Sequence, residues 1–223
     1  MATTLANLRS QVRIELRDPD GITFQDADID YAINQAYRKA YLRVTNRNQD
    51  YFITTVDIDV VAYQREYPLP SDFLRLKMLE IRVGGVTRPL RRRRRGISVN
   101  ITSGSVFNVG RTDLLFDFEG ANLVVEPTPA FSDTDALKMT YYPTVASLSA
   151  PTDAIHAEFK DMWVDVITLD AAKSCLSQIE ATGGYVATND IRERLKEVRD
   201  TMDDSIAVRS ISPQIVRKRR FFQ

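Results

Sequence analysis

The spacing of apolar residues changes twice along this 223-residue chain. It has the three-and-four spacing of helix faces near the N-terminus, the alternation of strands between about residues 54 and 142, and helical spacing again from about residue 151. An apolar helix face repeats every 3.6 residues and a strand face every two. The sequence therefore predicts an α+β fold, with helices at both ends and an antiparallel β-rich region inserted between them.

Two short amphipathic helices are expected first, hinged on a turn at residues 17–21. Pro19 and Gly21 favour a sharp reversal there. Thr4 is placed to cap the first helix, and Thr23 or Asp26 to cap the second. The apolar faces of these helices consist of Leu5, Leu8, Val12 and Leu16, and then of Ile29, Ile33, Ala36, Tyr37, Ala40 and Val44.

The middle of the chain alternates like a sheet. Residues 54–60 read as a half-buried strand, residues 67–72 as a proline-fixed extended segment, and residues 76–88 as a hairpin turning at Gly84-Gly85. Four more strand candidates follow, at residues 105–109, 114–118, 122–126 and 137–142. We expect an antiparallel sheet or a small barrel.

Two further helices are expected after about Pro151. A broad apolar stripe between Phe159 and Ile179 indicates a well-buried helix, ended by Gly183-Gly184, and a narrow seam between Ile191 and Ile206 indicates a helix with one partner surface. The expected domains are a helical hairpin at 1–50 and helices at 151–207 forming one helical core, a β-rich domain at 51–150, and an extended, flexible basic tail at 208–223.

Charge is strongly segregated although lysines plus arginines and acidic residues number 30 each. Residues 88–95 hold six arginines, and residues 209–223 hold four arginines and one lysine, with no acid in either segment. Without these 11, the chain has 19 basic and 30 acidic residues, a net charge near −11. Such a body with two basic segments suits a protein that touches a polyanion or an acidic partner at two places.

The sequence lacks the signatures of an enzyme, a cofactor site or a metal site. His156 is the only histidine and is expected to be a solvated or capping residue, and no phosphate-binding loop, nucleophile elbow or Cys-x-x-Cys pair is present. Acid pairs such as Asp57 with Asp59 are expected to face solvent. Cys175 is expected to be a buried, reduced thiol. No apolar run approaches the roughly 20 residues that span a bilayer, and no signal peptide is seen. We therefore expect the protein to be made in a cytoplasm and not to associate with a membrane.

Three stretches near the N-terminus carry short motifs. Residues 5–13 read Leu-x-x-Leu-Arg-x-x-Val-Arg, residues 16–21 contain an Asp-Pro turn after leucine, and residues 34–38 read Asn-x-Ala-x-Arg. The chain then continues with a β-rich middle containing Tyr-Pro-Leu-Pro-Ser-Asp-Phe at 67–73 and a helical C-terminal third. These motifs and this order resemble the head-to-tail connector proteins of tailed bacteriophages. The resemblance implies a structural protein of the virion, made in the host bacterial cytoplasm and located at the head-tail junction. It further implies a dodecameric ring that binds the portal protein and a tail or nozzle protein while genomic DNA passes through its lumen.

Three groups of residues are the candidate contact sites. The arginine run is expected to lie in an exposed loop, either solvated or touching DNA phosphates or a neighbouring subunit; it comprises Arg91, Arg92, Arg93, Arg94 and Arg95. The C-terminal segment joins charge to two aromatic anchors and is expected to dock on the portal; it comprises Arg217, Lys218, Arg219, Arg220, Phe221 and Phe222. The apolar stripe of the third helix is expected to pack between subunits through Phe159, Met162 and Trp163.

The sequence thus favours a non-enzymatic connector that forms a ring between portal and tail. The alternative is a nucleic-acid-binding regulator that uses the N-terminal helices as a helix-turn-helix and the arginines on phosphates. Against the alternative, the helix at 29–44 carries Tyr31, Gln35 and Arg38 but no dense basic face.

Overall fold

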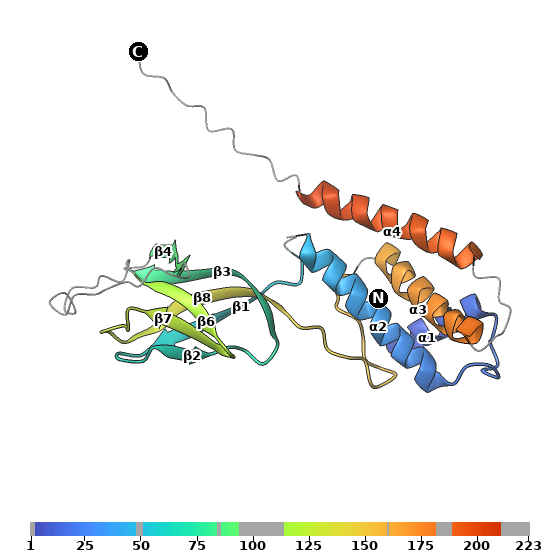
Figure 1. Ribbon diagram of the computed structural model, residues 1–223, viewed down its shortest axis with the longest axis horizontal. Helices are drawn as coiled ribbons and strands as arrows, with labels where there is room; N and C mark the ends of the chain where they lie inside the picture. Colours follow the sequence, from blue (N-terminus) through green and yellow to red (C-terminus); the bar gives the residue numbers. More distant parts are fainter. Residues whose placement is uncertain are drawn as a thin grey trace, which may run out of the picture. The chain divides into compact units, whose positions relative to one another are not determined.

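The computed structural model describes residues 3–47, 51–83, 86–93, 114–159, 161–181 and 189–210. These residues divide between two compact units (Figure 1). The helical unit comprises residues 1–51 and 145–223, and the β unit comprises residues 52–144. The β unit is thus an insertion within the sequence of the helical unit, and the predicted α+β class is confirmed.

The first helix, α1 (Leu5–Leu16), forms as the sequence predicts. The Thr4 hydroxyl accepts a hydrogen bond from the Asn7 N–H at 3.3 Å, which satisfies one of the free amides at the helix start. At the other end Arg17 takes a left-handed conformation, and its N–H bonds back to the last turn. Leu5, Leu8 and Val12 are fully buried.

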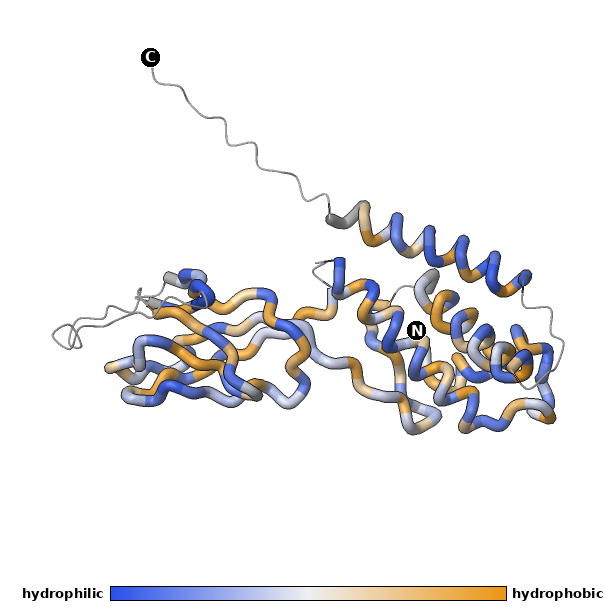
Figure 2. The backbone as a smooth tube through the Cα atoms, in the orientation of Figure 1, coloured by the Kyte–Doolittle hydropathy of each residue, from blue (hydrophilic) through white to orange (hydrophobic). Residues whose placement is uncertain are grey.

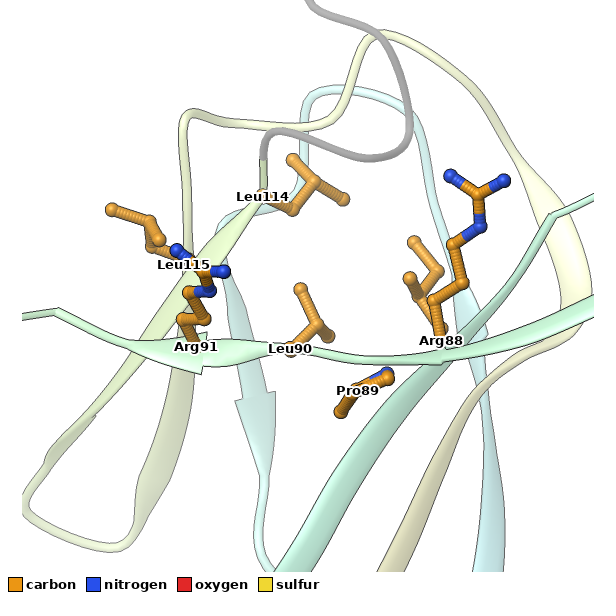
Figure 3. A pocket seen from close by; sticks show the side chains of 7 residues that line it. Arg88, Pro89, Leu90, Arg91, Leu114 and Leu115 are labelled. Atoms are coloured by element: carbon orange, nitrogen blue, oxygen red, sulfur yellow. The ribbon is translucent and has the colours of Figure 1, made fainter. Parts of the chain in front are cut away.

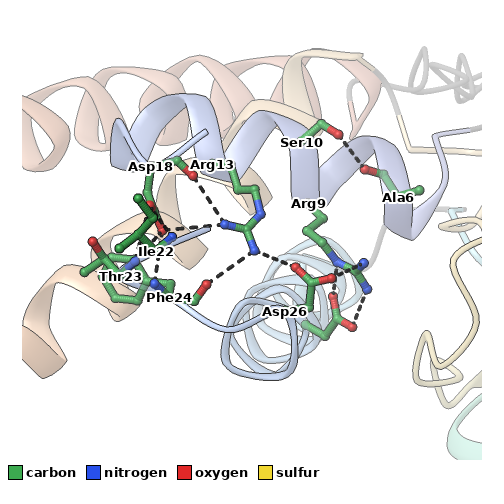
Figure 4. A network of polar contacts seen from close by, with 10 residues as sticks. Ala6, Arg9, Ser10, Arg13, Asp18, Ile22, Thr23, Phe24 and Asp26 are labelled. Atoms are coloured by element: carbon green, nitrogen blue, oxygen red, sulfur yellow. Dashed lines mark hydrogen bonds and ion pairs between the residues drawn. The ribbon is translucent and has the colours of Figure 1, made fainter. Parts of the chain in front are cut away.

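The second helix, α2 (Asp26–Asn46), starts differently from the prediction. Its N-cap is Gln25, whose side chain makes no capping bond, so neither Thr23 nor Asp26 is the cap. The preceding turn is instead organised by Asp18, whose carboxylate accepts hydrogen bonds from the N–H groups of Ile22, Thr23 and Phe24 (Figure 4). Capping from four residues or more upstream leaves no local sequence signal.

The helices α3 (Asp161–Ala181) and α4 (Asn189–Ser210) complete the helical unit. Helix α3 contacts α1, α2 and α4, so it is the central helix among those described. Long hydrophobic stretches mark α3 in Figure 2, whereas α4 is largely hydrophilic. Helix α4 runs to Ser210, so the predicted extended tail cannot begin at residue 208. Residues 211–223 lie outside the described part of the chain.

The segment after the β unit binds back to the first two helices. The Asn34 side chain donates to the Leu148 carbonyl at 2.9 Å and accepts from the Leu148 N–H at 2.8 Å. The Leu5 N–H donates to the Asp153 carbonyl, and the Tyr37 hydroxyl accepts from the His156 N–H. Residues 145–150, expected in the β-rich domain, therefore belong to the helical unit.

The β unit contains two four-stranded sheets among its described residues. One has the order β1-β8-β3-β4, and the other β2-β7-β6-β5 (Figure 1). The first sheet consists of β1 (Thr54–Val60), β8 (Asp133–Pro143), β3 (Phe73–Val83) and β4 (Val86–Pro89). The second consists of β2 (Glu66–Pro68), β7 (Asn122–Glu126), β6 (Leu115–Glu119) and β5 (Arg91–Arg92).

This arrangement corrects the expectation of one antiparallel sheet or barrel. Two sheets share one core, which buries Leu79, Leu137 and Met139 from the first sheet and Phe116 and Leu123 from the second. The β5–β6 pair is parallel, whereas the other pairs are antiparallel. The predicted hairpin of β3 and β4 is confirmed, and the strand predicted at 105–109 lies outside the described residues.

Chain connectivity fixes the two lateral sides of the β unit. Strand β1 leads into β2 through residues 61–65, and β4 leads into β5 through Leu90 alone. Each of these four strands is the end strand of its sheet. One lateral side of the unit is therefore formed by β1 and β2, and the other by β4 and β5.

Candidate functional site

The arginine run lies at the β4–β5 side of the β unit. Arg91 and Arg92 form the short strand β5, and their registers with Leu115 and Phe116 tie them to β6. The Arg93 N–H donates to the Phe116 carbonyl at 2.7 Å, which extends the pairing by one residue. The expectation of a loop is therefore wrong for Arg91 and Arg92, because β6 supplies backbone partners that the sequence alone does not show. Arg94 and Arg95 lie outside the described residues.

Two of these arginines are neutralised within the chain. The Arg92 Nε lies 3.1 Å from an Asp117 carboxylate oxygen, and the Arg92 guanidinium lies over the Phe118 ring, 5.6 Å from its centre. Arg93 forms an ion pair with Glu126 on β7. Both guanidinium groups thus fasten β5 to the neighbouring strands, and neither is an uncommitted cation.

Arg88 and Arg91, in contrast, are exposed and form no ion pair with any residue the structure describes. They border a cavity of about 550 Å³ at the edge of the sandwich. Figure 3 shows the side chains of Leu90 and Leu114 projecting into the space between the two arginines. A concave apolar surface with two positive groups at its rim suits a ligand that is partly apolar and carries or attracts charge. We call it the Arg88/Arg91 pocket.

The other predicted contact residues lie elsewhere. Trp163 is fully buried in its own chain, where its ring meets Tyr51 and Phe159 edge-on and its indole N–H donates to the Ser205 hydroxyl at 3.0 Å. Phe159 is 8% exposed and also packs on Tyr37. The prediction that these two residues form a subunit surface is therefore wrong, because the helical unit itself covers them. The Met162 side chain and the tail residues Arg217, Lys218, Arg219, Arg220, Phe221 and Phe222 lie outside the described residues.

The arginines of the N-terminal motif are structural. Arg9 binds the Asp30 carboxylate with two hydrogen bonds, of 2.9 and 2.7 Å, and also reaches Asp26 (Figure 4). Arg13 binds Asp26 and the carbonyls of Asp18 and Phe24. Two basic residues four apart on α1 thus meet two acidic residues four apart on α2. This matched spacing could have predicted the ion pairs between the two helices from the sequence. It is missed when the motif is considered on one helix at a time.

These contacts also bear on the helix-turn-helix alternative. A recognition surface needs basic groups free to meet phosphates, whereas Arg9 and Arg13 are committed to acidic side chains of the same hairpin. The hydrogen bond from Arg13 lowers the pKa of Asp26, so the pair is charged at neutral pH. The hairpin is therefore an internally neutralised packing element.

The titratable groups show few features of a catalytic or metal site. Burial raises the pKa of the Cys175 thiol to about 11, which makes it a poor nucleophile. The Nδ1 of His156 accepts a hydrogen bond from the Glu158 N–H at 3.3 Å, in the segment that precedes α3. Across the described residues, no group of three or more His, Cys, Asp or Glu side chains is placed to hold a metal ion. In the same residues no helix is long and apolar enough to cross a bilayer.

Comparison with known families decides the class. The profile of the SU10 adaptor protein family matches residues 3–216, which covers both units of the structure. The chain belongs to the SU10 adaptor protein family. This is a family of phage head-to-tail adaptors, so the resemblance found in the sequence is confirmed, and the protein is a structural adaptor of a phage virion. No curated protein of known function matches the chain.

Proposed function

We propose that this SU10 adaptor family protein assembles into a ring that joins the portal to the tail and surrounds the channel through which DNA passes. The family match over residues 3–216 carries the proposal, because it spans the whole fold. The partners are further copies of the chain, twelve in all as the sequence resemblance implies, the portal protein, and a tail or nozzle protein. Genomic DNA passes through the lumen without sequence reading.

The charge distribution supports contact with anionic or acidic surfaces at separate places. Among residues 88–93, Arg92 and Arg93 are ion-paired internally, whereas Arg88 and Arg91 form no ion pair with any described residue. Such guanidinium groups bind phosphates or carboxylates with equal ease. The arginine run therefore serves either the DNA lumen or an adjacent subunit.

The C-terminal residues 217–222 are proposed as the portal-docking segment. They combine four basic residues with two adjacent phenylalanines, and aromatic side chains and arginine are enriched in protein interfaces. The segment follows helix α4 in the chain, whose last residue is Ser210.

The decisive experiment is electron microscopy of the purified chain alone and mixed with the portal protein. We expect a closed ring stacked coaxially on the portal ring. Mass photometry of the same mixtures counts the subunits. A chain that stays monomeric and unbound in both samples contradicts the proposal, whatever its affinity for DNA.

A further inference from the structure

The turn between β1 and β2 presents an aromatic side chain in a strained backbone conformation. Tyr63 has a φ of +64°, and its side chain is 84% exposed. A bulky residue is rarely found at positive φ, where its Cβ is crowded. Strain of this kind persists where the surrounding structure enforces it, and it points to a function for the residue.

The turn is held by hydrogen bonds that do not involve the Tyr63 ring. The Tyr63 N–H donates to the Pro129 carbonyl at 2.8 Å, and the Ala62 N–H donates to the Ser132 hydroxyl at 2.9 Å. The Tyr67 hydroxyl donates to the Gln64 carbonyl at 3.0 Å. The backbone is thus fixed from three sides, while Tyr63 itself is 84% exposed. A fixed, exposed tyrosine loses little entropy on binding.

On the opposite lateral side of the same unit, the described residues leave a pocket. This Arg88/Arg91 pocket has apolar walls from Leu90 and Leu114, between two guanidinium groups that form no ion pair with any described residue (Figure 3). An aromatic ring placed in it buries apolar surface and faces the cations at the rim. Tyrosine and arginine are the residues most enriched at the centres of protein interfaces.

Charge on the two sides is complementary as well. Asp57 and Asp59, both exposed, lie on β1, just before the Tyr63 turn. Arg88 lies on β4 and Arg91 on β5, at the far edges of the two sheets. Within one chain these groups cannot meet, because β8 and β3 separate β1 from β4 by about 14 Å at the usual strand spacing. The complementary partner is a second copy.

We propose that Tyr63 of one copy inserts into the Arg88/Arg91 pocket of the next copy. The contact is heterologous, because the β1–β2 side of each β unit meets the β4–β5 side of its neighbour. A heterologous contact of this kind closes into a ring when its rotation divides the circle. The inference rests on the proposed ring and specifies which surfaces build it. The opposite charges around the aromatic contact favour this arrangement over a dimer in which two identical lateral sides meet.

The test is a double-cysteine variant, Y63C together with R88C, in the full-length chain. The protein is assembled alone and on the portal, oxidised with copper phenanthroline, and run on a non-reducing gel. A disulfide needs Cα atoms within about 7 Å, so the two positions of one chain cannot bridge. We expect a ladder of covalent oligomers whose largest member equals the ring. Cys175 is buried and stays unreacted.

Two controls match the variant. The pair Y63C with L74C replaces the pocket position by another exposed residue and is expected to give no ladder. Each single cysteine variant is also expected to stay monomeric on the gel.

The outcomes separate the contact from the ring. If rings form but Y63C/R88C gives no ladder on the gel, the proposed contact is wrong and the adaptor function is unaffected. Bridges from the cysteine at position 88 to the portal protein assign the pocket to the portal and also overturn it. Absence of rings in both samples overturns the proposed function together with the contact.

A second variant excludes simple misfolding. Asparagine tolerates positive φ better than tyrosine, so Y63N is expected to leave the urea midpoint of the monomer unchanged or raise it. The same variant is expected to raise the concentration at half-assembly at least about tenfold, because it removes the inserted ring. Unchanged assembly by folded Y63N contradicts the proposal.

Discussion

Asp18 shows how one side chain sets the geometry of the N-terminal hairpin. It is 8% exposed, and its carboxylate accepts hydrogen bonds from three successive backbone amides while Arg13 lies 3.5 Å away. Burial acts to raise the pKa of Asp18, but the amide bonds from Phe24, Thr23 and Ile22 and the charge of Arg13 outweigh it, so the pKa lies below its ordinary value. The folded hairpin therefore depends on the charged form.

The pH dependence follows from that direction. A carboxyl whose pKa is lower when folded contributes stability above its unfolded pKa of 3.8, and this contribution disappears as the pH falls below that value. We expect the helical unit to lose stability as the pH falls through about 4. Asp18→Asn, which carries no charge and has only one accepting atom, is expected to lower the melting temperature at pH 7 by roughly 3 to 6 °C. Its melting temperature should also vary less with pH than that of the wild type.

Circular dichroism melts from about pH 6 to pH 3 measure both effects. The matched control is Asp20→Asn, which alters an exposed acid two residues along the same turn. If both variants melt like the wild type, Asp18 does not organise the turn.

Among the elements, helix α4 differs from α3 in what holds it. A narrow seam of Ile191, Leu195, Met202 and Ile206 is buried, and ion pairs flank it on several sides. Asp203 of α4 binds two arginines, Arg43 in α2 and Arg47 at the C-cap of α2. Arg194 of α4 binds Glu15 of α1 through two hydrogen bonds. Arg199 of α4 binds Asp170 of α3. A small apolar contact with several partly exposed ion pairs makes the docking of α4 sensitive to salt.

Asp203→Asn is expected to loosen α4 selectively. The hydrogen bond from Arg43 lowers the pKa of Asp203, so the carboxylate is charged at neutral pH and the variant removes a full charge from two arginine contacts. We expect amide hydrogen exchange in residues 189–207 to speed up about three- to fivefold, which corresponds to roughly 0.6 to 1 kcal/mol. Exchange in α3 should change less. Asp204→Asn, at a neighbouring exposed acid, is the control; equal acceleration by both variants would show that the ion pair is not responsible.

The elements also show what the sequence can and cannot predict. Helices α1, α3 and α4 and the strand β1 follow from periodicity, because each is long enough to show several repeats of one face. The three-residue β2 and two-residue β5 are too short for any period, and they exist because β7 and β6 offer them backbone partners. The division into two sheets depends on pairings between residues far apart in sequence, such as Thr54 with Tyr141.

For the site residues, the amino-acid type predicted the role in the structure less well than the position in the fold did. The run of arginines looks uniform in the sequence, yet register with β6 and β7 places Asp117 beside Arg92 and Glu126 beside Arg93 and leaves Arg91 exposed. Trp163 was expected on an outer face because the apolar stripe of its helix is broad. The stripe is broad because α3 contacts three helices of its own chain.

In the whole molecule, the proposed portal contact is separable from the fold. The hydrogen bonds and ion pairs described for the helical unit all lie before residue 208. Deleting residues 213–223 is therefore expected to leave the circular dichroism spectrum and melting temperature unchanged while abolishing portal binding. Surface plasmon resonance against immobilised portal rings measures the loss, with a substitution of Arg217, Lys218, Arg219 and Arg220 by serine to separate charge from Phe221 and Phe222. Portal binding by the truncated chain at wild-type affinity would rule out the docking segment.

The insertion of the β unit also has a consequence for synthesis on the ribosome. Helices α1 and α2 bury their apolar faces against α3, but about 115 residues separate the end of α2 from the start of α3. At about 5 to 20 residues per second, the ribosome needs roughly 6 to 23 s to make this stretch. During that interval the nascent hairpin exposes Leu8, Ile33 and Val44, and the last strand of the β unit, β8, is complete at Pro143, before α3 is made. The β unit is therefore able to fold first, and the core of the helical unit forms only once α3 has emerged.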